Sequence, residues 1–157
     1  MALLDAKEYD PRPAQRRKRI ITIAVAVIVF PLAIWYFFFY YWPEEHVINK
    51  FFHALEQKDF DAAYGIYQGD PDWKQHPEKY PDYSVNRFTL DWGPAGEYGP
   101  IFSHHVDCSL KPKTNSSGVV VVVTINNRAE PRSMWVENKT KSISDSPVGK
   151  VVCHGQQ

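Results

Sequence analysis

The sequence has no excess of positive charge, because its 18 lysine and arginine residues are balanced by 18 aspartate and glutamate residues. Residues 1–19 contain six basic and three acidic side chains, so the rest of the chain carries a net charge of −3. A protein that binds nucleic acid needs a basic surface, since it must neutralise phosphate groups. The composition therefore argues against a nucleic-acid partner.

Motifs of catalysis and cofactor binding are also scarce. The sequence has no glycine-rich phosphate loop, no serine in a glycine-flanked nucleophile elbow and no cysteine–histidine catalytic motif. Its six histidines show no recognisable metal-ligand spacing. His104 and His105 are neighbours on a predicted strand, where adjacent side chains point to opposite faces and do not converge on one ion. We therefore predict no cofactor and no metal site.

Charge is missing altogether from residues 20–42, which read IITIAVAVIVFPLAIWYFFFYYW. At about 1.5 Å per residue such a helix is roughly 34 Å long, enough to cross the roughly 30 Å hydrocarbon core of a bilayer. A cleavable signal peptide ends in small residues, whereas this run ends in aromatic residues typical of a membrane interface. The sequence predicts one uncleaved transmembrane helix over residues 20–42.

Four consecutive basic residues stand immediately before this run: Arg16, Arg17, Lys18 and Arg19. Positive residues beside a transmembrane helix remain on the cytoplasmic side. We therefore expect residues 1–19 to form a cytoplasmic tail and residues 43–157 to lie outside the cytoplasm. In a double-membraned bacterium this arrangement corresponds to an inner-membrane anchor and a periplasmic domain.

The outer part reads as an α+β domain in which helices pack on an antiparallel sheet. Apolar residues at helical spacing predict a helix over 43–58 and a second over 59–67, followed by a proline-rich irregular segment with a short helical turn near 82–88. After Pro100 the hydrophobic period changes to two. Four strands are predicted from this pattern, over residues 102–110, 119–127, 133–138 and 141–145.

This order of elements resembles the nuclear-transport-factor-2-like superfamily. The likeness lies in residues 44–67, where the segment KDFDAAY leads from one helix into the next, and in the closing hairpin WVENKTKSISDSP. It covers most of residues 44–147, with the proline-rich segment 68–100 in place of the superfamily's third helix. The resemblance implies a domain that binds a partner or small ligand, or an isomerase or dehydratase.

One histidine, His104, is the candidate for the enzymatic alternative. The alternating pattern places it on the apolar face of the first strand with Phe102, Val106 and Cys108. Asp91 or Glu97 in the preceding segment could reach it, and a His–carboxylate pair, His104 with Asp91, suits general acid–base catalysis. The same pair also suits a purely structural hydrogen bond.

Large aromatic residues are concentrated between positions 60 and 100. Aromatic side chains are enriched at the energetic centres of protein interfaces, so this group is a candidate surface for a ligand or partner. The alternative is that the rings form the core of a domain with few aliphatic residues. The candidate binding residues are Trp73, Tyr80, Tyr83, Trp92 and Tyr98.

The chain contains only two cysteines, Cys108 and Cys153. Both fall in the part expected outside the cytoplasm, where oxidising conditions preserve disulfides, and no other intramolecular pair exists. We predict a Cys108–Cys153 disulfide that fastens the C-terminal segment across the sheet. The alternative is two separate thiols, with Cys108 acting as a small buried apolar residue.

Together these features predict a single-pass membrane protein whose outer domain binds a partner protein or small ligand near the bilayer. Its expected partners are the lipid bilayer and another membrane or periplasmic protein, with the chain acting as an accessory or assembly subunit of an envelope complex. The competing hypothesis is an isomerase or dehydratase that uses His104 and Asp91.

Overall fold

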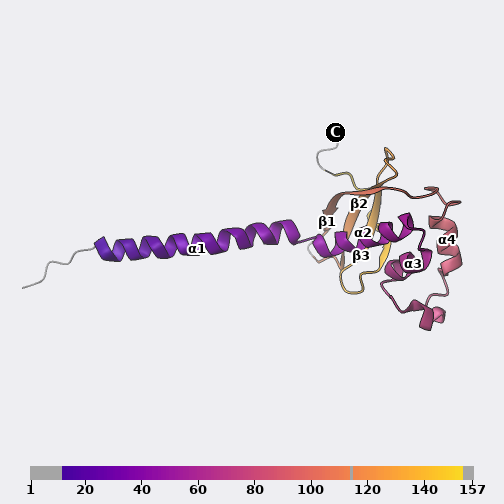
Figure 1. Ribbon diagram of the computed structural model, residues 1–157, viewed down its shortest axis with the longest axis horizontal. Coiled ribbons are helices and arrows are strands. Elements are labelled where there is room, and N and C mark those ends of the chain that lie inside the picture. The colour runs from indigo at the N-terminus through magenta and orange to yellow at the C-terminus, as the bar shows by residue number, and fades with distance from the viewer. Residues whose placement is uncertain (1–11, 114, 154–157) are drawn as a thin grey trace, which may run out of the picture. The chain divides into compact units, whose positions relative to one another are not determined.

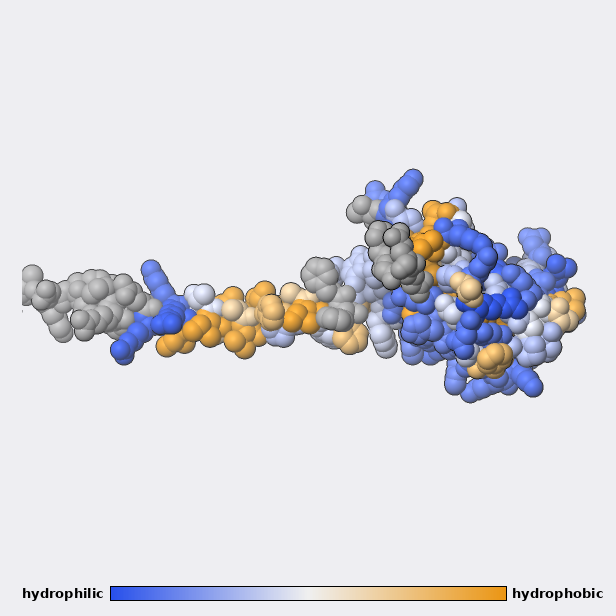
Figure 2. Space-filling view, turned by 90° about the horizontal axis from the view of Figure 1, so that it is seen from above, coloured by the Kyte–Doolittle hydropathy of each residue, from blue (hydrophilic) through white to orange (hydrophobic). Residues whose placement is uncertain are grey.

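The computed structural model describes residues 12–113 and 115–153, which form two separate units (Figure 1). The first unit contains helix α1, Arg12–Phe39, and the second is the domain that begins at Tyr41. Within α1, the segment Arg16–Tyr36 is long and apolar enough to cross a membrane by length and composition. Figure 2 shows hydrophobic side chains along this helix, preceded by a hydrophilic group at its N-terminal end.

Helix α1 differs in its limits from the expected span. It begins at Arg12 rather than at residue 20, and it ends at Phe39 rather than at residue 42. Residues 1–11 of the expected cytoplasmic tail lie outside the described residues. The large apolar side chains from Ile20 to Trp35 that the structure describes are all at least 42% exposed.

Three α-helices belong to the domain. Helix α2, Trp42–Glu56, starts with a proline in its first turn, where the missing backbone N–H costs nothing. Helix α3, Phe60–Gln68, is capped by Asp59, whose Oδ1 accepts a hydrogen bond from the backbone N–H of Ala62 at 3.0 Å. Helix α4, Val85–Trp92, replaces the short helical turn expected near 82–88.

The four strands form one antiparallel sheet in the order β1-β2-β3-β4. Helices α2 and α3 contact the sheet, and α4 packs on α3 (Figure 1). The α+β architecture expected from the sequence is confirmed, with strand limits displaced by one or two residues. The strands are β1, His104–Leu110; β2, Gly118–Ile125; β3, Arg132–Glu137; and β4, Ile143–Asp145.

A bulge in β1 corrects the expected alternation of its side chains. Val106 pairs with Val123, but Cys108 pairs with Val122, so one extra residue, Asp107, is inserted between them. Val106 packs against the core under the helices, whereas Cys108 packs on the opposite face of the sheet. Strict alternation had placed both residues on one face, and the insertion reverses the side of everything that follows it.

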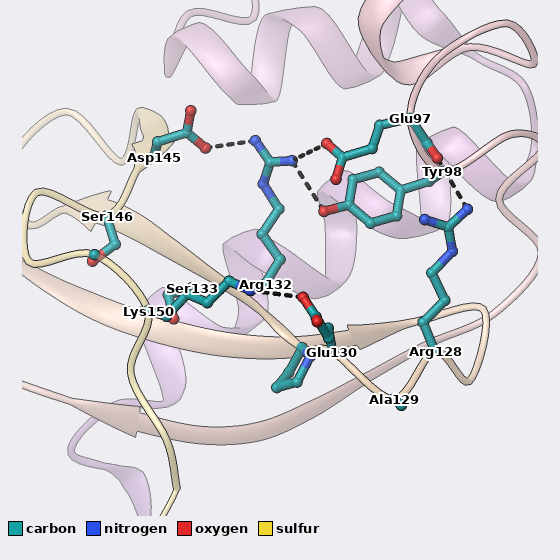
Figure 3. Close-up of a pocket in the computed structure, with 12 residues that line it drawn as sticks. Glu97, Tyr98, Arg128, Ala129, Glu130, Arg132, Ser133, Asp145, Ser146 and Lys150 are labelled. Carbon is teal, nitrogen blue, oxygen red and sulfur yellow. Dashed lines mark hydrogen bonds and ion pairs between the residues drawn. The ribbon is translucent and has the colours of Figure 1, made fainter.

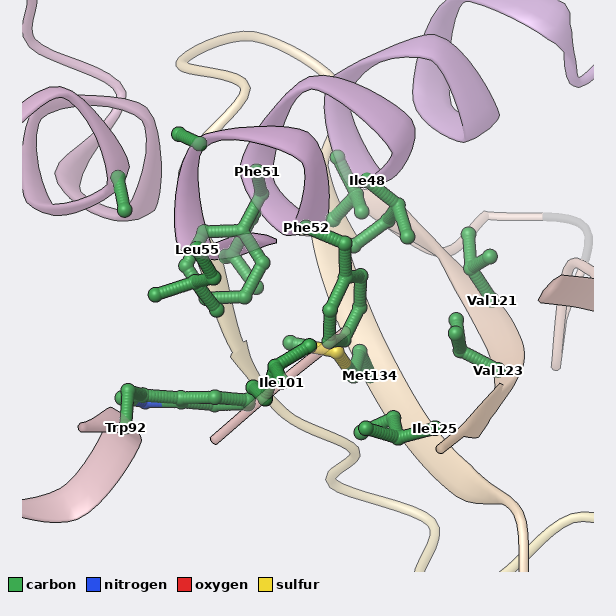
Figure 4. Packing of buried hydrophobic residues seen from close by; sticks show 14 of the residues in the cluster. Ile48, Phe51, Phe52, Leu55, Trp92, Ile101, Val121, Val123, Ile125 and Met134 are labelled. Atoms are coloured by element: carbon green, nitrogen blue, oxygen red, sulfur yellow. The ribbon is translucent and has the colours of Figure 1, made fainter. Parts of the chain in front are cut away.

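The main core lies between the helices and one face of the sheet (Figure 4). Ile48, Phe51 and Phe52 of α2 are completely buried there against Val121 and Val123 of β2. Full burial of each such side chain contributes about 1.5–3 kcal/mol to folding. The ring of Phe51 also meets Trp92 of α4 edge to face, with centroids 5.0 Å apart, so α4 is fastened to the same core.

The other face of the sheet is covered by the C-terminal segment. Val120 and Val122 of β2 are fully buried and form a second cluster with Cys153. A disulfide joins Cys153 to Cys108, in agreement with the expected pairing, with the two Cα atoms 6.0 Å apart. The backbone N–H of Val151 donates a hydrogen bond to Ser133 Oγ at 2.9 Å. The segment is therefore held as a strap, although it adds no strand to the sheet.

Removal of the disulfide is expected to weaken this strap. The double variant Cys108→Ser, Cys153→Ser should lose up to about 4 kcal/mol of the free energy of unfolding, because the bridge restricts a long loop of the unfolded chain. The loop spans a sequence separation of 45 residues. Denaturant titration of the full chain in detergent, followed by tryptophan fluorescence, measures the difference.

Reductant should shift the midpoint of the natural protein and leave that of the double variant unchanged. Equal midpoints for the two proteins without reductant would contradict a stabilising bridge.

Candidate functional site

A groove of about 550 Å³ surrounds Arg132, the first residue of β3 (Figure 3). Three segments that are distant in sequence form its walls. They are the loop between α4 and β1, the connection from β2 into β3, and the segment that follows β4. The lining includes Glu97, Tyr98, Arg128, Glu130, Arg132, Asp145, Ser146 and Lys150.

The guanidinium of Arg132 is held from two sides. Its Nη2 donates a hydrogen bond to Asp145 Oδ1 at 2.6 Å, and its Nη1 donates to Tyr98 Oη at 3.1 Å and to Glu97 Oε2 at 3.3 Å. Only 24% of the Arg132 side chain is exposed, whereas Glu97 is 68% exposed and Asp145 is 77% exposed. The cation is therefore fixed, and its two anionic partners are solvated.

Two aromatic rings flank the same guanidinium. Its Cζ lies 5.0 Å from the centroid of the Trp92 ring and 5.5 Å from that of Tyr98, within the range of cation–π attraction. Burial opposes the charge of Arg132, but the hydrogen bonds from Arg132 to Tyr98 and Asp145 outweigh it and raise the pKa of Arg132 above its usual range. The group is a permanent, oriented cation.

A second hollow, of about 440 Å³, adjoins the groove and shares Arg132, Tyr98, Glu97 and Asp145 with it. Tyr83, Asp91 and Trp92 contribute to its wall together with Arg132 itself. The phenol of Tyr83 donates a hydrogen bond to Asp91 Oδ2 at 3.1 Å. Burial and this bond to a carboxylate raise the pKa of Tyr83, so the phenol remains a hydrogen-bond donor at neutral pH.

Asn126, at the end of β2, fixes the loop that carries Glu97 and Tyr98. Its Nδ2 donates to the carbonyl oxygens of Tyr98 at 3.2 Å and Pro100 at 2.9 Å. Its Oδ1 accepts from the backbone N–H groups of Phe102 at 3.0 Å and Ser103 at 3.4 Å. One side chain thus satisfies four backbone groups of a segment without regular structure, and it sets the position of the Tyr98 ring.

The rim of the groove carries further charges and one unsatisfied hydroxyl. Arg128 Nη2 donates to the carbonyl of Glu97 at 3.0 Å, and Lys150 Nζ donates to Glu130 Oε2 at 2.6 Å. Ser146 Oγ is buried and makes no hydrogen bond within the part of the chain that the structure describes. A buried hydroxyl in that condition is unusual, and this one belongs to the lining of the groove.

The structure does not bring His104 and Asp91 together, so the acid–base pair expected from the sequence is corrected. His104 Nδ1 lies 2.7 Å from Glu56 Oε1, and its Nε2 lies 3.1 Å from Asn49 Oδ1. Its ring stacks on Phe52 with centroids 5.2 Å apart. Asp91 instead bonds to Tyr83 and forms an ion pair with Arg87. The histidine is fastened to helix α2, which the sequence separation of 48 residues concealed.

The aromatic residues proposed as a binding surface divide into two groups. Trp73 and Tyr80 pack around Tyr64 beside the core, where the Trp73 Nε1–H donates to the carbonyl of Asp61 at 3.2 Å. Trp92 is almost completely buried, and it stacks on Tyr98 with centroids 6.0 Å apart. Trp92, Tyr98 and Tyr83 line the two hollows around Arg132. Trp73 and Tyr80 line neither of them.

A separate polar cluster closes the loop between α3 and α4. Oδ2 of Asp70 lies 2.5 Å from His76 Nε2, accepts from Tyr80 Oη at 2.6 Å and pairs with Lys79 at 3.3 Å. The hydrogen bonds from Tyr80 and His76 hold the pKa of Asp70 well below its usual range. Because the Asp70 cluster ties together residues 70–80, we interpret it as a structural fastening of that loop.

Comparison of the chain with family models, with characterised proteins and with solved structures gives no match. Among residues 12–113 and 115–153, no group of three or more histidine, cysteine or acidic side chains is arranged to hold a metal ion.

Sequence reasoning missed Arg132 and Asn126. Arg132 opens a strand that was expected to start at Ser133, and Asn126 was expected to belong to the strand over residues 119–127. One signal was present in the sequence, the consecutive pair Asn126 and Asn127. Both residues adopt positive φ, at 51° and 55°. Asparagine tolerates this left-handed backbone better than most residues, but the pattern does not reveal what the Asn126 side chain contacts.

The Asp70 cluster predicts a defined acid response. Because the pKa of Asp70 is depressed in the folded state, its contribution to stability is present above the unfolded pKa of about 4 and is lost as pH falls through that value toward the folded pKa. Asp70→Asn should lower the melting temperature at pH 7, and the difference from the natural protein should shrink below about pH 4.

Thermal unfolding of the full chain in detergent at a series of pH values tests this. Asp82→Asn, an exposed position on the following segment, removes the same charge and should leave the melting temperature nearly unchanged. A stability difference for Asp70→Asn that is independent of pH would contradict the assignment.

Proposed function

We propose that the protein is a single-pass membrane protein whose outer domain binds a segment of a partner protein in the groove around Arg132. The domain faces the extracytoplasmic side, the periplasm in a double-membraned bacterium. Its role is that of an accessory or assembly subunit of a membrane complex, and its fold resembles the nuclear-transport-factor-2-like superfamily in the order of its elements.

The location is supported by two independent features. Helix α1 has the length and composition of a membrane span, with basic residues at its N-terminal end. The Cys108–Cys153 disulfide belongs to the part that follows the helix, and structural disulfides persist in oxidising compartments. An anchor with this orientation places the disulfide where such a bond is stable.

The binding role is supported by one observation above all: Arg132 is oriented and mostly buried, yet it is neutralised by carboxylates that are exposed. Arginine is favoured at interface centres because its fork of donors and its flat face serve both polar and aromatic contacts. Here the guanidinium of Arg132 is already oriented in the unbound protein, by its hydrogen bonds to Tyr98 and Asp145 and by the ring of Trp92. The groove is also open and is lined by six charged side chains, which suits a chain segment better than an enclosed apolar ligand.

The orientation follows from the basic residues and is testable in cells. A reporter that is active only outside the cytoplasm should give signal when fused to the C-terminus and none when fused to the N-terminus. Replacing Arg16, Arg17, Lys18 and Arg19 with glutamine should reduce this asymmetry, because these charges retain the N-terminal end in the cytoplasm. The opposite pattern for the natural sequence would exclude the proposed location.

Partner binding at the groove is testable by site-specific photo-crosslinking in intact membranes. A photoreactive amino acid at position 129, which is exposed on the groove, should form a discrete adduct with another protein. The same amino acid at position 78, exposed on the loop between α3 and α4, serves as the control and should give none.

A second variant determines whether the adduct depends on the proposed site. Arg132→Lys should remove most of the adduct at position 129, because lysine keeps the charge but lacks the two-pronged donor. Arg87→Lys, which alters an exposed arginine on α4, should not. Adducts that persist in Arg132→Lys would show that the groove is not where the partner binds.

A further inference from the structure

The two carboxylates that neutralise Arg132 come from the same chain and have little to hold them in place. Asp145 is the last residue of the three-residue strand β4, and its side chain is 77% exposed. Glu97 belongs to the loop before β1, and its side chain is 68% exposed. Exposed ion pairs contribute little net stability, because solvent competes with each partner. Because an incoming carboxylate would restore the bond to the partly buried Arg132, the exchange of either carboxylate costs little.

The cation, by contrast, remains in position when its anions leave. The ring of Trp92 and the phenol of Tyr98 contact Arg132 independently of the carboxylates. Asn126 secures the Tyr98 backbone, and Trp92 is buried in the core. After departure of Asp145, Nη2 would point into the groove with no acceptor, in a place where a carboxylate oxygen fits at 2.6 Å.

We propose that the groove takes an acidic segment of the partner protein, whose carboxylate replaces Asp145 on Arg132. The inference deepens the proposed function and rests on it. In the unbound protein Asp145 acts as an internal stand-in for the ligand. The exchange is one carboxylate for another, so the charge and the hydrogen bonds of Arg132 are the same before and after it.

Two further features of the groove fit such a ligand. Ser146, next to Asp145, offers a buried hydroxyl without a hydrogen-bond partner among the described residues, on the same wall of the groove. Arg128 and Lys150 add two more cations along the lining, and Glu97 and Glu130 limit the excess of positive charge. The groove runs from Arg128 past Arg132 to Asp145 and Ser146, which suits an extended chain more than a compact anion (Figure 3).

A doubly charged phosphate is a poorer fit. The lining has three cations and three carboxylates. When Asp145 moves away from Arg132, the charge that an incoming group must replace is therefore a single negative charge. A phosphate group would bring a second charge beside Glu97, which lies 3.3 Å from the same guanidinium. A carboxylate of a peptide avoids this repulsion, and the arginine fork matches it in two-pronged geometry.

The test uses the full chain in detergent and fluorescently labelled, end-capped peptides whose binding is followed by anisotropy. Hexaglutamate should bind, and hexaglutamine and hexalysine should bind at least about tenfold more weakly, since each lacks the charge-assisted hydrogen bond. Inorganic phosphate at equal concentration should not displace hexaglutamate. Equal binding of hexaglutamine, or displacement by phosphate, would overturn the proposal.

Two variants with opposite expected signs locate the effect. Arg132→Lys keeps the net charge and should weaken hexaglutamate binding about tenfold or more. Asp145→Asn removes the internal competitor and should strengthen binding up to about fivefold, the equivalent of an exposed ion pair. Asp61→Asn changes the net charge equally at an exposed pair with Lys74, and it should leave affinity unchanged.

These outcomes also separate the inference from the proposed function. If Asp145→Asn and Asp61→Asn strengthen binding equally, the attraction is a general effect of charge and the inference is wrong, even where Arg132→Lys proves too unstable to study. A groove-specific adduct at position 129 without hexaglutamate binding would leave the proposed function intact and exclude the carboxylate ligand. If hexaglutamate binding changes with the variants as expected but no adduct forms at position 129, Arg132 binds carboxylates, and the proposed binding of a partner protein in the groove is excluded.

Discussion

Burial of strand β2 on both faces is the constraint on which the rest of the domain depends. Val119 to Val123 are at most 3% exposed, so neither face of the strand can be left to solvent. The helices cover the face formed by Val119, Val121 and Val123. The opposite face, formed by Val120 and Val122, is covered by the strap around Cys153. The bulge at Asp107 serves this arrangement, because it turns Cys108 to the side where the strap lies.

The same arrangement creates the groove. The chain leaves β4 at Asp145 and continues toward the strap. Asp145 and the following Ser146 and Lys150 line the groove beside the start of β3. The loop that enters β1 reaches the same end and brings Glu97 and Tyr98. Arg132 stands where the two segments meet. The two segments bury most of the Arg132 side chain. Its contacts with the Trp92 ring and with the Tyr98 hydroxyl offset the cost of burying the charge.

Much of the fold was predictable because local patterns determine it. Asp59 caps α3, as aspartate commonly does at the start of a helix, and the β-branched run of β2 is typical of a buried strand. The disulfide was predictable because only one pair was possible. The bulge was not, since a single inserted residue leaves no mark in composition and reverses the side on which Cys108 and Leu110 lie. Helix α4 was underestimated because its sequence, VNRFTLDW, carries few strong helix formers and is held by the packing of Phe88 and Trp92.

The site was less accessible than the fold because its contacts are distant in sequence. Arg132 meets Glu97 across 35 residues and Tyr98 across 34, and none of the three belongs to a recognisable motif. Both ring nitrogens of His104, the candidate catalytic residue, contact side chains of α2. Arg132, at the start of β3, has carboxylate partners that are exposed. The proposed binding role of Arg132 rests not on its residue type but on the difference in exposure between the group and its partners. Arg132 is fixed while its anions are solvated, and the proposed exchange for a carboxylate from outside depends on that asymmetry.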